Sequence, residues 1–252
     1  MKAISPIGAL GLLLALTLTT AAVAGPATYE SPVTRVSVLE LYTSHGCSSC
    51  PPADRWLRTL VDDPGLWRQL IPLAFHVDYW DGLGWADRFA RPEFSDRQWA
   101  YYRAGALQAV YTPGFILNGR EWRGRRFANT PPDRSSRERV GRLRLTAKPG
   151  VAATLSFAPV GAPGALEAHL AVLGFGLSSA IGGGENAGRT LVEDFVVLGT
   201  SSTRTTGGEP LRWQLAWPDL TPGMTTRRAV VAWVSPPHDP RPVQAVAGWL
   251  RD

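Results

Sequence analysis

The spacing of apolar residues divides the first part of the chain into strands and helices. Residues 36–42 form a nearly continuous apolar run, which predicts a buried strand. Four apolar residues then recur at helical spacing and share one face of a predicted helix: Ala53, Trp56, Leu57 and Leu60. Residues 71–77 predict a second strand, with Pro72 near its start or at a sheet edge.

The same alternation continues to about residue 148. Ser95 and Gln98 have the spacing of a capping box and predict a second helix. Asn118-Gly119 predicts a tight turn between two short strands. A last helix is expected over residues 134–145. The predicted order of elements is therefore β-α-β-α-β-β-α.

From residue 149 onward, period-two patterns replace helical ones. Six strands separated by Gly, Pro and Ser turns are predicted over residues 151–157, 166–173, 191–198, 211–217, 229–234 and 243–250. We expect a small antiparallel β-sandwich over residues 149–252, following a domain of mixed composition over residues 25–148.

Composition and charge narrow the possible functions. The chain has 252 residues, 44% of them hydrophobic, which is enough for a sizeable core. The net charge of +5 comes almost wholly from arginine. The densest run, residues 120–144, is interrupted by Glu121, Asp133 and Glu138, and no nucleic-acid-binding motif accompanies it. We expect no nucleic-acid partner.

The N-terminus has the pattern of a signal peptide. Lys2 precedes an apolar run over residues 7–18, and small residues follow up to Ala24. Cleavage after Ala24 would remove residues 1–24, leave no membrane span and place the protein in the periplasm or outside the cell. The alternative is an uncleaved anchor, for which the apolar run is short.

The only two cysteines, Cys47 and Cys50, lie between the first predicted strand and the first helix. Free N–H groups and the helix dipole at such a junction stabilise a thiolate, so we predict Cys47 as the nucleophile and Cys50 as the resolving thiol. A disulfide across so short a loop contributes only about 2 kcal/mol to stability. Redox chemistry therefore explains the pair better than an inert local disulfide, which is the alternative.

The order of elements, with C-x-x-C at the first helix and Thr112-Pro113 before the third strand, resembles the thioredoxin superfamily. The resemblance implies an α/β thioredoxin-like domain (βαβαββα), with Pro113 as a cis-proline facing the cysteines and Thr112 beside it. One difference is that two prolines follow Cys50, whereas thioredoxins place one between the cysteines.

Four blocks resemble more closely the exported thioredoxin-like family known as domain of unknown function 1223. They cover residues 40–54, 75–81, 111–113 and 184–189. This resemblance implies no activity, because the family has none assigned.

Polar and aromatic side chains at the strand ends are further candidates for the site. His45 precedes the cysteines and His76 ends the second predicted strand. Both strands end at one sheet edge, where we expect His76, Asp78 and the cysteines to converge. Tyr79 and Trp80 are candidates for a substrate groove. Asp78, Asp81 and Asp87 suit either an acid–base set or turn capping, the more common role.

Two functions of different classes follow. The first is an exported thiol–disulfide oxidoreductase with a protein client, a redox partner and no required cofactor. The second is a binding protein or metal carrier without turnover, because two thiolates and a histidine suit Cu(I), with Cys47, Cys50 and His76 as candidate ligands.

Overall fold

The computed structural model describes residues 25–124, 132, 134, 136–204, 211–220 and 227–250. The predicted signal peptide, residues 1–24, lies outside these residues. Within the described part, none of the helices is long and apolar enough to cross a membrane.

The described residues form many strands and few helices. The α-helices are α1 (Pro51–Arg58) and α2 (Pro92–Arg103), and the 3-10 helices used below are η1 (Thr59–Asp62), η2 (Asp78–Leu83) and η4 (Gly184–Asn186). The strands of the first half are β1 (Ala27–Glu30), β2 (Ser37–Thr43), β3 (Leu70–His76), β4 (Gly114–Leu117), β5 (Arg120–Glu121) and β6 (Gly141–Lys148). Those of the second half are β7 (Ala152–Pro159), β8 (Glu167–Gly174), β9 (Leu177–Ala180), β10 (Thr190–Glu193), β11 (Val196–Arg204), β12 (Leu211–Ala216), β13 (Arg228–Ser235) and β14 (Gln244–Trp249).

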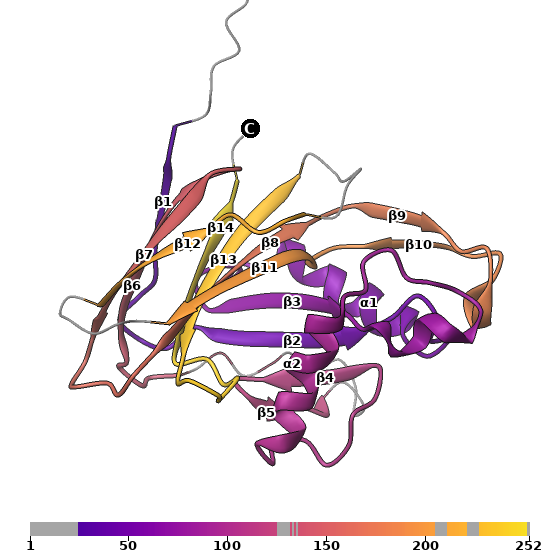
Figure 1. The fold of residues 1–252 in the computed structure, drawn as a ribbon, viewed down its shortest axis with the longest axis horizontal. Coiled ribbons are helices and arrows are strands. Elements are labelled where there is room, and N and C mark those ends of the chain that lie inside the picture. Colours follow the sequence, from indigo (N-terminus) through magenta and orange to yellow (C-terminus); the bar gives the residue numbers. More distant parts are fainter. Residues whose placement is uncertain are drawn as a thin grey trace, which may run out of the picture.

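An eight-stranded mixed sheet runs through the molecule in the order β14-β13-β8-β11-β3-β2-β4-β5 (Figure 1). β2 and β3 are parallel, and Thr43 pairs with His76 at their carboxyl ends. β4 is antiparallel to β2. β11 joins β3 through the parallel pair Val196 and Ala74, so strands from both halves of the chain share this sheet.

A four-stranded antiparallel sheet, β1-β6-β7-β12, packs against the end of the large sheet that contains β8, β13 and β14. Leu145 of β6 and Leu155 of β7 meet Leu170 of β8 in the core between the two sheets. The first and last strands are also linked here, because the hydroxyl of Tyr29 in β1 donates to the carbonyl of Trp249 in β14 at 2.6 Å.

A second core lies around β2, β3 and the helices. Leu41, Phe75 and Leu57 of α1 are completely buried in it. Neighbouring residues of β8 contribute to different cores, Leu170 to the first and Ala171 to this one, because successive side chains of a strand point to opposite faces.

The expected fold class, an α/β thioredoxin-like βαβαββα domain followed by a small β-sandwich, is wrong. The molecule is mostly β, and its second-half strands extend the same sheet that contains β2 and β3. The division of the chain at residues 24 and 148 stays a prediction.

The helix expected over residues 134–145 accounts for part of this error. Residues 133 and 135 lie outside the described part, and residues 136–140 are not helical. β6 occupies 141–148, with Leu143, Leu145 and Ala147 buried and Arg142 and Arg144 exposed. That alternation is the period of a strand, and pairing with β1 and β7 stabilises it.

Several other elements differ in extent from the expectation. α2 begins at Pro92, so Ser95 lies inside its first turns and does not cap it. The strand expected over 191–198 is two strands, because the chain turns at Phe195, whose φ is 62°. β9 was not expected, and the turn between β4 and β5 at Asn118-Gly119 is confirmed.

Candidate functional site

The turn between β2 and α1 carries Cys47 and Cys50, which form a disulfide with Cα atoms 5.4 Å apart. Cys50 precedes the helix and has helical φ and ψ angles of −76° and −41°, although a following proline disfavours them. Pro51 and Pro52 fit the first turn because N–H groups there need no helical partner. The prolines that distinguish this motif from thioredoxins therefore leave the start of α1 regular.

Both cysteines are shielded from solvent. Cys47 is 1% exposed and Cys50 is 0% exposed, whereas Ser48 and Ser49 are exposed. The Oγ atom of Ser49 lies 3.2 Å from the Sγ atom of Cys47. The two serines are therefore in contact with solvent, whereas the sulfurs are shielded from it.

The loop between β9 and β10 contains η4 and is called the η4 loop. It is hydrogen-bonded to the cysteine turn. The buried side-chain amide of Asn186 donates to the carbonyls of His45 at 2.8 Å and Cys47 at 2.9 Å. Glu185 accepts a hydrogen bond from the N–H of Ser48 at 2.9 Å. This N–H belongs to the turn that leads into α1. It is one of the donors that could otherwise stabilise a cysteine thiolate.

The other side of the turn faces η2 and the proline loop. A Cβ added to Gly46 would lie 3.1 Å from the Cβ of Trp80, so glycine allows this close approach. The indole N–H of Trp80 donates to the Oγ1 of Thr112 at 2.8 Å. The bond between Thr112 and Pro113 is cis, as the thioredoxin resemblance implied.

A groove of about 300 Å³ opens beside this loop. Its lining includes Ser49 from the cysteine turn, Thr112, Pro113, Phe115 and Trp122. The groove is therefore partly aromatic and adjoins the exposed edge of the disulfide turn, where an extended peptide has room to lie.

Two candidates from the sequence, Asp78 and Tyr79, contact α2 instead of the disulfide turn. Asp78 accepts a hydrogen bond from the hydroxyl of Ser95 at 2.5 Å. The hydroxyl of Tyr79 donates to the side-chain carbonyl of Gln98 at 3.1 Å. Both contacts attach η2 to the helix.

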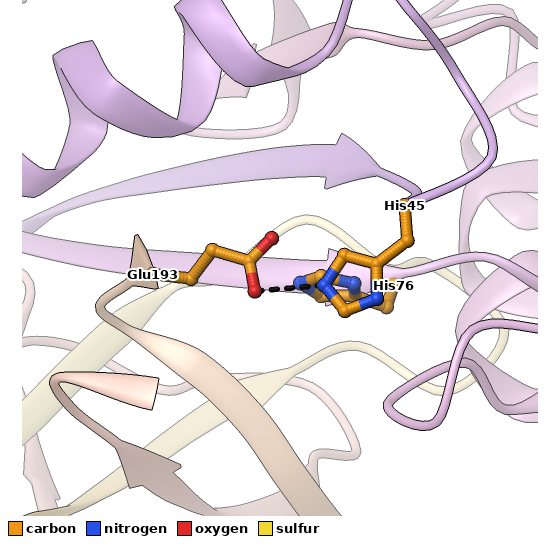
Figure 2. A group of neighbouring side chains, drawn as sticks. All are labelled: His45, His76 and Glu193. Carbon is orange, nitrogen blue, oxygen red and sulfur yellow. Dashed lines mark hydrogen bonds and ion pairs between the residues drawn. The ribbon is translucent and has the colours of Figure 1, made fainter. Parts of the chain in front are cut away.

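A buried polar cluster lies where the carboxyl ends of β2 and β3 meet β10. The Nε2 of His45 lies 2.8 Å from the Oε2 of Glu193, and the two residues are 148 positions apart (Figure 2). The Nδ1 of His76 donates to Asp87 at 2.7 Å, and the Nδ1 of His45 lies 3.1 Å from the other oxygen of Asp87. Side-chain exposure of the four residues is 3% or less.

Burial and mutual charge shift the protonation of this cluster. Burial, followed by the charge of Glu193, raises the pKa of Asp54 to about 8. Burial disfavours the imidazolium of His76, but the charge and hydrogen bond of Asp87 outweigh it and raise the pKa of His76 to about 9. Protons are therefore held here at neutral pH, next to the disulfide turn.

The structure brings His45 and His76 together at the sheet edge where the parallel strands end, and joins Asp87 and Glu193 to them. In the part of the chain that the structure describes, the His, Cys, Asp and Glu ligand atoms that gather within 4.8 Å of one another are those of His45, His76 and Glu193. That group contains no cysteine.

The sequence did not point to Glu193, and it marked Asn186 only as part of the family block without assigning it a role. Both reach the site through the β9–β10 hairpin, whose position depends on strand pairing far along the chain. The signal that pointed toward this hairpin was the family resemblance at residues 184–189.

Comparison with known proteins gives one family match. The family model described as "Protein of unknown function (DUF1223)" matches residues 38–235. No curated protein matches the chain.

Two solved structures are similar in fold. The crystal structure of protein AGR_C_4864 from Agrobacterium tumefaciens aligns with a TM-score of 0.56 and 23% identity, over 84% of this chain and 94% of that one. HBP35 of Porphyromonas gingivalis aligns with a TM-score of 0.56 and 15% identity, over 86% of this chain and 76% of that one. At these identities the likeness shows a shared fold alone.

Proposed function

The chain belongs to the DUF1223 family of proteins of unknown function, and we propose that it is an exported thiol–disulfide oxidoreductase that acts through Cys47 and Cys50. Its client is a protein thiol or disulfide in the periplasm or outside the cell, and a separate redox partner restores the starting state. The N-terminal segment with signal-peptide character supports export.

The observation that carries the proposal is the position of the disulfide. It closes a ring of four residues at a strand–helix junction, and by loop entropy this contributes only about 2 kcal/mol. It also lies in the turn that borders the groove at Pro113. A bond that does little for stability and adjoins a peptide-sized groove is suited to exchange.

The exchange proceeds through two displacements. A client thiolate attacks the Sγ of Cys47, a client–Cys47 disulfide forms, and Cys50 leaves with the electron pair of the broken bond. A second thiolate of the same client then attacks the client sulfur that is bonded to Cys47. A disulfide forms within the client, and Cys47 leaves as a thiolate. The client loses two electrons and the Cys47–Cys50 pair gains them; the reduced pair carries out the reverse reaction.

Pro113 and Thr112 are suited to position the client. They line the groove together with Ser49, and the Thr112 hydroxyl is held by Trp80. An extended client segment in the groove would lie beside the cysteine turn. Binding there would bring the attacking sulfur toward Cys47 once the η4 loop gives access.

Stopped-flow oxidation of a fluorescent dithiol peptide by the purified disulfide form tests the proposal. Cys47→Ser is expected to abolish exchange. Cys50→Ser, mixed with the peptide in its disulfide form, is expected to trap a mixed disulfide between Cys47 and the peptide, because the Cys47 thiolate attacks the peptide disulfide and no second protein thiol releases it. Mass spectrometry detects this species.

Thr190→Ala is the control, because it alters an exposed residue at the start of β10 without removing a sulfur, and it is expected to react at a rate close to that of the unmodified protein. Equal exchange rates in the unmodified protein and in Cys47→Ser would overturn the proposal.

A further inference from the structure

We propose that His45, His76 and Glu193 form a binding site for a divalent transition-metal ion, with Zn²⁺ as the first candidate. The ligands are the Nε2 atoms of the two imidazoles and the carboxylate of Glu193, and His76 gives up its Nε2 proton as the ion binds. This site goes beyond the proposed redox function and does not depend on it.

The first support is convergence. One potential ligand atom from each residue lies within 4.8 Å of the other two (Figure 2). Ligand atoms around a tetrahedral zinc ion lie about 3.3–3.6 Å apart, as follows from bond lengths near 2.0–2.2 Å. Side-chain shifts of about 1 Å bring the wider pairs to this separation, and His45 and Glu193, now 2.8 Å apart, move apart by roughly 0.5 Å to admit the ion.

The second support is orientation by Asp87. One carboxylate oxygen accepts a hydrogen bond from the Nδ1 of His76 at 2.7 Å, which leaves the Nε2 of His76 as its free ligand atom. The other oxygen lies 3.1 Å from the Nδ1 of His45 without a hydrogen bond, and the Nε2 of His45 faces Glu193 at 2.8 Å. Carboxylates that fix the far nitrogen of a histidine are the usual outer partners of metal ligands.

Asp87 is itself held in place. The backbone N–H of Phe89 donates to one of its oxygens at 2.9 Å, and the N–H of His45 donates to the other at 2.8 Å. The orienting group is thus fixed before any ion binds.

The third support is that two buried ligand atoms lack a hydrogen-bond partner. The Nε2 of His76 and the Oε1 of Glu193 are buried and have no hydrogen-bond partner. Buried polar atoms are nearly always paired, so two unpaired ligand atoms in one cluster point to a bound species. A metal ion between them would satisfy both.

The donor set selects the class of metal. Two imidazoles and one carboxylate are ligands of zinc sites that keep a fourth position for water, whereas Cu(I) favours thiolates. A cavity of about 180 Å³ between α1 and β10 reaches one of the ligands, because its lining includes Glu193 and Asp54 together with Arg55 and Arg58. Water from this cavity can supply the fourth ligand.

Metal binding to the full-length protein, stripped with chelator, tests the site. Zn²⁺ is titrated against a chromophoric competitor, and Co²⁺ is added as a visible-absorption probe. We expect one equivalent per chain. His76→Gln and Glu193→Gln should each weaken binding at least 10-fold, and Asp87→Asn about 10- to 100-fold.

His169→Gln is the matched control, because it removes a histidine of β8 outside the cluster and should leave the affinity unchanged. The double variant Cys47→Ser/Cys50→Ser should also bind normally. No stoichiometric binding, binding that needs the cysteines, or binding unchanged in both His76→Gln and Glu193→Gln would overturn the proposal.

X-ray absorption of the zinc-loaded unmodified protein gives a result that does not depend on variant folding. The expected first shell contains nitrogen and oxygen near 2.0 Å, with scattering from two imidazoles. Sulfur at about 2.3 Å would overturn the assignment.

Discussion

Glu40 is a buried carboxylate in the middle of β2, and four hydrogen bonds satisfy it. Arg97 donates to it twice, at 2.8 and 2.9 Å, and the hydroxyls of Tyr42 and Tyr101 donate at 2.8 and 2.6 Å. Its removal leaves the guanidinium of Arg97 largely buried without a counter-charge. Removing one partner therefore costs more stability than the intact pair contributes.

We predict that Glu40→Ala lowers the free energy of unfolding by about 3–5 kcal/mol, the usual loss when one partner of a buried ion pair is removed. Urea unfolding measures the change. Glu138→Ala, which breaks the exposed pair with Arg35, should cost less than about 1 kcal/mol. Comparable losses in both variants would contradict this account.

His169 gives a prediction about pH. Burial, followed by the charge of Arg97, lowers the pKa of His169 to about 3. Between pH 6.5 and 3 the unfolded chain takes up a proton at this residue and the folded protein does not, so stability falls as pH falls. The slope from this group is up to about 1.4 kcal/mol per pH unit. His169→Gln should lose that part of the slope in unfolding measured from pH 7 to 4; an unchanged slope would contradict the prediction.

At the level of elements, the η4 loop is hydrogen-bonded to the cysteine turn. Asn186 donates to two carbonyls of the cysteine turn, and nothing replaces these bonds if the side chain is truncated. We predict that Asn186→Ala speeds reduction of the Cys47–Cys50 bond by dithiothreitol several-fold, because the loop opens more often. It should also destabilise the protein by about 1–3 kcal/mol, because buried carbonyls lose their donors.

The exposed residue Thr190, at the start of β10, provides the control for this loop. Thr190→Ala should leave the reduction rate unchanged, since its side chain is outside the contact with the turn. Equal rates for Asn186→Ala and the unmodified protein would show that the loop does not limit access.

Alternating patterns made most strands predictable, and the strand order predicted that the first two strands of the motif, β2 and β3, end at one sheet edge. The helix expected at 134–145 failed because local residues allow either structure there and the pairing of β6 with β1 and β7 decides. The position of Glu193 could not be predicted from the sequence for a similar reason. It depends on where β10 lies, and that follows from sheet pairing between segments far apart in the sequence.

For the whole molecule, the decisive feature is that β11 pairs with both β3 and β8. The large sheet contains strands from both sides of the predicted boundary at residue 149. The core between the two sheets likewise contains side chains of β6 together with those of β7 and β8. Neither half of the chain can bury its apolar side chains alone.

We therefore predict one cooperative unfolding transition in calorimetry, with a van 't Hoff enthalpy close to the calorimetric enthalpy. A chain that ends at Lys148 should be insoluble, because it exposes the edge of β3 and the inner face of β6. Two resolved transitions, or a soluble folded fragment, would instead support two separate domains.

The contact between Tyr29 and Trp249 sets the timing of folding during synthesis. The two residues are 220 positions apart, which a ribosome covers in roughly 10 to 40 s. β6, the partner strand of β1, follows after about half of that interval, and the segment that contains Trp249 follows only at its end. A contact across so long a stretch of chain can form only after residue 249 has been synthesised, and its large sequence separation slows folding.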